Sequence, residues 1–143
     1  MENENTALLD GIYKASSIGI EATKMIFPKV QDRPLRRQIA QQYFDYQTTS
    51  SKVKSLMHYN GKRPKENNKF KKSMLRESIR FNTMMNKTPG HIAELMVGGT
   101  AMGIVQVTKN LNNYDGADIK VKKIAEDFLV NEQKNIDKLK KHL

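Results

Sequence analysis

Apolar residues recur at three- and four-residue steps along most of the chain, a spacing typical of amphipathic helices. The first such segment ends at Pro28. Asp32 followed by Arg33 and Pro34, and later Thr88 followed by Pro89, each combine a helix N-cap residue with a first-turn proline. Strand-like alternation is nowhere sustained. We therefore predict an all-α protein with helices over residues 5–27, 33–60, 68–86, 89–113 and 117–142.

The lengths of the connections predict how these helices pack. The first and second predicted helices are joined by a short segment, as are the fourth and fifth, so each pair should form an antiparallel hairpin. A long crossover from Gly61 to Lys87 joins the hairpins and holds the shorter third helix. The chain is thus expected to form one helical-bundle domain over residues 1–143.

This layout resembles the ferritin-like four-helix-bundle superfamily, and in particular its short bacterial members of uncharacterised function. The stretches that carry the resemblance are HIAELMVGGTAMGIVQVTKNLNNYD in the fourth predicted helix and FLVNEQKNIDKLKKHL in the last. The resemblance implies an up-down bundle with a di-iron or di-manganese centre. Such a centre takes one inward Glu from each of two helices and a Glu-x-x-His from each of the other two. No Glu-x-x-His occurs in the sequence, so we expect the centre to be missing or degenerate.

Few residues remain that could replace the missing ligands. Only the last predicted helix directs a carboxylate, Glu132, towards the core, and Asn135 stands where the family's histidine would be. His91 and Glu94 form a His/carboxylate pair at helical spacing, but two ligands do not close a metal site. We predict no catalytic residue and no cofactor. Iron or manganese bound by Glu132, Glu94 or His91 is the alternative.

Several polar residues are expected at one level inside the bundle. They could form a hydrogen-bonded layer that fixes the register of the helices, because buried polar groups need partners. They could instead line a small ligand pocket or a residual single-ion site. We favour the layer, and expect Glu132 to have the most perturbed ionisation because burial raises a carboxylate pKa. The predicted layer contains Ser16, Gln42, Tyr46, Gln106, Glu132 and Asn135.

The fourth predicted helix is apolar nearly all round, which indicates burial on both sides. Its Gly98, Gly99 and Gly103 suggest the close approach of a neighbouring helix. Its outer face should be covered either by the crossover helix or by a second subunit, and we predict a homodimer through the fourth helix and the crossover helix. The crossover helix would contribute the stripe Phe70, Met74, Phe81 and Met85.

Most of the net charge of +10 lies on the crossover, since residues 61–90 hold 9 basic and 2 acidic side chains. Such a run could bind an anionic partner, including a nucleic acid, by releasing counterions. The simpler interpretation is a solvated linker, because stacking aromatic residues are scarce there. The candidate anion-binding patch over residues 62–76 is Lys62, Arg63, Lys65, Lys69, Lys71, Lys72 and Arg76.

The composition excludes several classes of function. The absence of cysteine removes disulfides, thiolate metal sites and cysteine nucleophiles. The short apolar runs and the polar, acidic start of the chain predict a soluble cytoplasmic protein with no membrane span. We expect a non-enzymatic structural or interaction protein without a di-metal centre. The alternatives are a divergent metal-binding ferritin-like oxidoreductase or iron-handling protein, and a protein that binds polyanions through the crossover.

Overall fold

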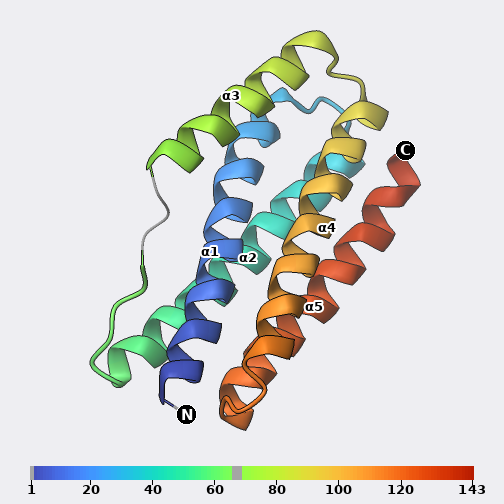
Figure 1. The fold of residues 1–143 in the computed structure, drawn as a ribbon. Coiled ribbons are helices and arrows are strands. Elements are labelled where there is room, and N and C mark those ends of the chain that lie inside the picture. The colour runs from blue at the N-terminus through green and yellow to red at the C-terminus, as the bar shows by residue number, and fades with distance from the viewer. Residues whose placement is uncertain (1, 66–68) are drawn as a thin grey trace.

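The computed structural model describes residues 2–65 and 69–143, with the backbone alone at positions 2, 69–71, 81, 84 and 85. Every regular element in these ranges is helical (Figure 1). The described residues form five α-helices and two short 3-10 helices, η1 at Phe27–Lys29 and η2 at Lys140–His142. The α-helices are α1 (Glu2–Ile26), α2 (Arg33–Tyr59), α3 (Lys69–Met85), α4 (Pro89–Asn113) and α5 (Ile119–Leu139).

The helix ends follow the local signals in the sequence. The Asp32 side chain caps α2 by accepting a hydrogen bond from the backbone N–H of Leu35 at 3.0 Å. Thr88 caps α4 in the same way, through the backbone N–H of His91. Gly61, just after α2, has a φ of 71°, the left-handed conformation that glycine adopts without strain. These caps and turns place the helix boundaries close to the predicted ones.

The four long helices pack as two hairpins, α1 with α2 and α4 with α5, with the short α3 between them in the chain. This confirms the predicted fold class. Helix α1 also packs against α4, and α2 against α5 (Figure 1). Because the crossover returns the chain to the other end of the molecule, α2 and α4 run in the same direction (Figure 1). None of the helices in the described ranges contains a stretch both long and hydrophobic enough to span a bilayer.

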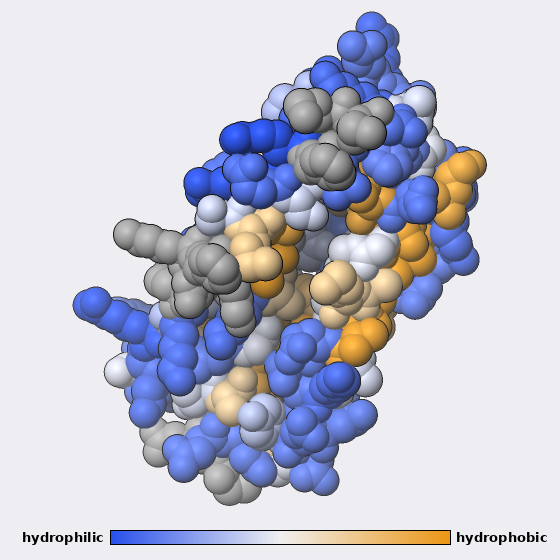
Figure 2. Space-filling view, turned by 45° about the horizontal axis from the view of Figure 1, so that its top comes forward, coloured by the Kyte–Doolittle hydropathy of each residue, from blue (hydrophilic) through white to orange (hydrophobic). Residues whose placement is uncertain are grey.

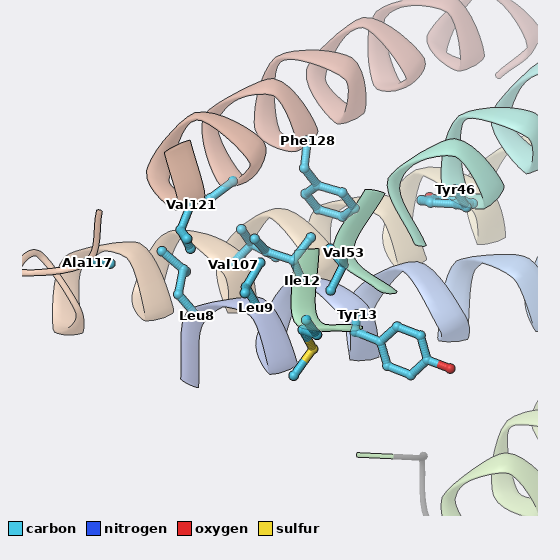
Figure 3. Packing of buried hydrophobic residues seen from close by; sticks show 12 residues of the cluster. Leu8, Leu9, Ile12, Tyr13, Tyr46, Val53, Val107, Ala117, Val121 and Phe128 are labelled. Atoms are coloured by element: carbon cyan, nitrogen blue, oxygen red, sulfur yellow. The ribbon is translucent and has the colours of Figure 1, made fainter. Parts of the chain in front are cut away.

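The core is divided into two apolar clusters. One lies towards the start of α1 and packs side chains such as Leu9, Ile12, Val107 and Phe128 between the helices (Figure 3). The other lies at the opposite end of the bundle. Its members are Ile26, Val30, Leu35, Ile39, Ile79, Ile92, Ala93, Met96 and Leu139. Between the two clusters, each of the four long helices has polar or small residues at its mid-height.

The position of α3 bears on the predicted cover of α4, and Met74 is the one member of the predicted stripe whose side chain the structure describes. Helix α3 packs against α1 and buries Ile79 and Thr83, whereas Met74 of the predicted stripe is 58% exposed. The side chains of Phe70, Phe81 and Met85 lie outside the described residues. Since α3 lies against α1, it leaves Met102 on α4 75% exposed. Cover by a second subunit stays a prediction.

Candidate functional site

A chain of hydrogen bonds crosses the bundle between the two apolar clusters. Gln42 on α2 donates from Nε2 to the hydroxyls of Tyr46 and of Thr100 on α4, each at 2.8 Å. The Tyr46 hydroxyl donates to Oε2 of Glu132 on α5 at 2.8 Å. The Thr100 hydroxyl donates to the backbone carbonyl of Met96 at 2.7 Å. All four side chains are buried, and they connect three of the four long helices.

The chain continues along α5 and back to α2. Asn135 donates from Nδ2 to Oε1 of Glu132 at 3.1 Å and accepts from Nε2 of Gln38 at 3.2 Å. Asn135 is as deeply buried as Glu132, and Gln38 is slightly more exposed. Each oxygen of the Glu132 carboxyl group therefore receives one hydrogen bond from a neutral donor.

Burial dominates the electrostatics of this cluster. It raises the pKa of Glu132 to about 7, against the opposing effect of the hydrogen bonds from Tyr46 and Asn135. The charge of Asp45 adds to the increase. Burial, followed by the charge of Glu132, also raises the pKa of Tyr46 well above its usual value. Tyr46 therefore remains a phenol that donates to Glu132, while Glu132 changes its charge near neutral pH.

Gln42 has the least complete set of partners in the cluster. The hydroxyls of Tyr46 and Thr100 already donate elsewhere, so they offer only lone pairs to Gln42 and orient its amide nitrogen towards themselves. The Oε1 atom of Gln42 is buried and accepts no hydrogen bond from the described residues. The cluster thus has more acceptors than donors.

A groove between α1 and α4 leads down to this cluster. It has a volume of about 610 Å³, and Tyr46, Thr100 and Glu132 form part of its lining. Figure 2 shows a hollow near the middle of the face on which α1 and α4 lie, with hydrophobic residues gathered beside it. A larger hollow over α2 is more open and is lined by exposed side chains such as Phe44 and Tyr59. The α1–α4 groove is therefore the better enclosed of the two.

Small residues keep the groove open. Its α1 wall is a row at four-residue steps, Ala7, Gly11, Ala15 and Gly19, and its α4 wall includes glycines. A Cβ atom at Gly19 would lie 2.5 Å from Cε2 of Tyr46, so only glycine fits over that ring. On α4, a Cβ atom at Gly103 would lie 3.7 Å from Oε2 of Glu132 and would cover the carboxylate.

The groove is polar at one end and apolar at the other. The polar end of the groove lies near the N-terminal end of α1. It is lined by Asp10, Lys14 and Lys65, together with amide side chains of α4. The backbone N–H of Lys65 donates to Oδ1 of Asp10 at 3.3 Å. Towards the other end the lining is Ile18, Ala22, Leu75, Met96 and Met102. Glu132 and Tyr46 lie between the two ends, at the floor.

Five of the six residues predicted for the polar layer are buried, and Gln106 is exposed. Ser16 is buried but donates to the backbone carbonyl of Ile12 on its own helix at 2.9 Å. The prediction for Gln106 is wrong because α4 is apolar all round, so its pattern does not define an inward face. Thr100 takes the expected place of Gln106, and sequence reasoning also missed Gln38.

The expected role of two glycines is also wrong. Among the described residues, no atom of another helix lies within 4 Å of a Cβ atom built at Gly98 or Gly99, so neither marks a close approach of helices. Gly99 instead faces the groove. The close approaches occur at Gly19, over Tyr46, and at Gly11, against the Asn110 side chain. The four-residue row of small residues on α1 is the sequence signal for this wall.

The candidate metal ligands do not come together. Glu94 is exposed at the start of α4, His91 is half-buried, and Glu132 lies at mid-height. In the described ranges no three His, Asp or Glu side chains lie close enough to hold a metal ion. The ring atom Nε2 of His91 is buried and forms no hydrogen bond with the described part of the chain.

The basic residues of the crossover are only partly described. Lys62, Arg63 and Lys65 are exposed just after α2, Arg76 is exposed on α3, and Lys72 is half-buried. The side chains of Lys69 and Lys71 lie outside the described residues. Anion binding by this patch stays a prediction.

Comparisons with protein-family models, with curated proteins and with solved structures give no match to this chain.

Proposed function

We propose that this protein is a non-enzymatic binding protein, a ferritin-like bundle without a di-metal centre that holds a small organic molecule in the groove between α1 and α4. The observation that carries the proposal is the groove itself, which leads from the surface to a buried, hydrogen-bonded carboxyl group. The polar cluster then has two roles. It aligns the helices, and it forms the floor of the ligand site.

The dimensions and lining of the groove support binding. Pockets for small molecules measure roughly 300 to 1,000 Å³ and combine apolar walls with a few placed polar groups. This groove, of about 610 Å³, lies within that range. Its polar floor groups are held in position by Asn135 and Gln42, so a ligand meets them already oriented.

The arrangement of Glu132 suits a binding role. Both oxygens of Glu132 accept hydrogen bonds from Tyr46 and Asn135, so the carboxyl group is held in a fixed orientation before a ligand arrives. Each oxygen keeps a lone pair for a donor group of the ligand.

Two neighbouring glycines provide a matched test of the groove. Gly99 lines it and Gly98 does not, and both have open space around the position of a Cβ atom. We expect the neutral fluorescent probe N-phenyl-1-naphthylamine to bind the native protein saturably, with a rise in its emission. Gly99→Leu should raise the Kd of the probe at least ~10-fold, because burying an isobutyl group in the groove removes apolar contact area from the probe.

Gly98→Leu is the control, since it adds the same side chain to the same helix outside the groove. Its Kd should equal that of the native protein. Absence of saturable binding to the native protein, or equal Kd values for the two variants, would overturn the proposal. Circular dichroism checks that both variants keep their helical content.

A further inference from the structure

We infer that the groove selects a molecule with a protonated amine, which lies against Glu132 while its apolar body extends towards Ile18 and Met102. The inference rests on the proposed ligand-binding function and assigns the chemical class of the ligand. Three observations support it: the position of the buried Glu132 carboxyl group, the hydrogen-bond partners of that group, and the walls of the groove on either side of it.

Glu132 is a buried acid that is paired with no cation among the described residues. Its side chain is only 2% exposed, and its hydrogen-bond partners are the neutral groups of Tyr46 and Asn135. None of the ion pairs among the described residues includes it. Buried carboxylates in proteins are normally paired with a positive group, because desolvation of a lone charge is costly. A ligand cation would supply the missing partner.

The unused hydrogen-bonding capacity of the floor also points to a donor-rich group. An ionised carboxyl group has about four lone-pair sites, and Glu132 uses one on each oxygen. Nearby, Oε1 of Gln42 accepts nothing from the described residues. A protonated primary amine brings three N–H donors and no acceptor, so it complements a floor that has acceptors to spare.

The walls of the groove indicate the chemistry of the part of the ligand that lies beyond its ammonium group. On one side of Glu132 the groove is lined by apolar side chains, including Ile18, which is 43% exposed, and Met102, which is 75% exposed. A ligand lying there would cover both. Methionine walls adapt to the shape of an apolar body. The small residues of α1 leave space for a flat group such as an aromatic ring.

Protonation of Glu132 should be linked to binding of the amine. The other ionisable groups around Glu132 are Tyr46 and Asp45 on α2, with Asp10 and Lys14 on α1 and Lys65 of the crossover at the polar end of the groove. In the described lining, α4 contributes no ionisable side chain, Tyr114 follows α4, and α5 contributes Glu132. An ammonium group would stabilise the ionised form of Glu132, so binding near neutral pH should release a proton.

A pair of probes of equal shape tests the inference. 2-Naphthylmethylamine carries the ammonium group, and 2-naphthylmethanol replaces it with a hydroxyl group. At pH 8 we expect the amine to bind the native protein at least ~10-fold more tightly than the alcohol. Glu132→Gln should bring the two Kd values together by weakening the amine. Titration calorimetry at pH 7 in two buffers of different ionisation enthalpy should show proton release for the amine only.

Two further variants make the result specific. Glu94→Gln removes one negative charge from an exposed position on α4 and should leave the preference for the amine unchanged. Asp10 is the other carboxylate among the described residues that line the groove. If Asp10→Asn abolishes the preference while Glu132→Gln keeps it, the ammonium group lies at the polar end and the inference is overturned. Equal affinities of the native protein for amine and alcohol also overturn it, while binding of N-phenyl-1-naphthylamine would still support the proposed function.

Discussion

Replacing Glu132 with glutamine is expected to raise the free energy of unfolding at pH 8 by about 3 kcal/mol and to change it little at pH 4. In the folded protein burial raises the pKa of Glu132 to about 7, from an ordinary value of 4.5. Each pKa unit corresponds to about 1.4 kcal/mol. At pH values between 4.5 and about 7 the folded state keeps a proton that the unfolded state has lost. The free energy of unfolding of the native protein therefore falls as the pH rises towards 7.

Glutamine keeps the shape of the side chain and carries no charge at any pH. Its carbonyl oxygen can accept from Asn135, and the Tyr46 hydroxyl can accept from its amide nitrogen. Urea unfolding at several pH values between 4 and 8 measures the difference between the native protein and Glu132→Gln. Glu94→Gln, an exposed substitution on α4, should stay within about 0.5 kcal/mol of the native protein throughout. A pH-independent difference for Glu132→Gln would show that its ionisation is not suppressed by folding.

This prediction bears on why the chain carries an acid at this position. A residue that lowers stability at physiological pH and has a neutral replacement of the same shape is typical of a functional site. Glu132→Gln should therefore give a more stable protein at pH 8 that has lost its preference for an amine. The unfolding measurement needs no ligand, and the binding measurement compares the Kd values of the amine and the alcohol. The two measurements are therefore independent.

Replacing Gly19 with alanine should lower the free energy of unfolding by about 2 to 3 kcal/mol, although alanine favours helices more than glycine does. The new Cβ atom would lie 2.5 Å from Cε2 of Tyr46, a ring that is only 5% exposed and packs against Phe128 with 6.4 Å between ring centroids. Overpacking of this kind costs roughly 1 to 3 kcal/mol. A shift of the Tyr46 ring would also strain the hydrogen bond from the Tyr46 hydroxyl to Glu132. That hydrogen bond contributes about 1 kcal/mol or more.

Gly98→Ala is the matched control for this substitution. Gly98 lies in the middle of α4, and no atom of another helix in the described part of the chain lies within 4 Å of a Cβ atom built there. The higher helix propensity of alanine is then the main effect of the substitution. Gly98→Ala should raise the free energy of unfolding by about 0.5 to 1 kcal/mol. The sign of the change in thermal unfolding temperature distinguishes the two positions. An increase for both variants would mean that Tyr46 can move away from Gly19 at no cost.

The fold could be predicted from the sequence because its boundaries have strong local causes. Asp32, Pro34, Thr88 and Pro89 set the starts of α2 and α4, and the connection lengths determine which helices form hairpins. The inward faces of α2 and α5 could be predicted as well, because charged residues mark their outer sides. Gln42, Tyr46, Glu132 and Asn135 are accordingly buried.

The face of α4 could not be predicted by the same reasoning. Its apolar residues surround the helix, so either of two faces satisfies the pattern, and the pattern predicts an inward Gln106 although this residue is exposed. The observed inward positions are Met96, Thr100, Gly103 and Val107. The groove was missed for a related reason. Its α1 wall consists of alanine and glycine, which contribute little to a hydrophobic pattern, and its shape depends on how two hairpins distant in sequence meet.

The hydrogen bonds of the polar cluster have a consequence for the order in which the protein assembles. The three that connect different helices join residues 58, 86 and 97 positions apart in the chain, and all of them link α2 to the other hairpin. Contacts within each hairpin are far more local and form faster. We therefore expect the cluster to close late, when the two hairpins dock. Substitutions in it should act mainly on the rate at which the protein unfolds, and leave the rate at which it folds nearly unchanged.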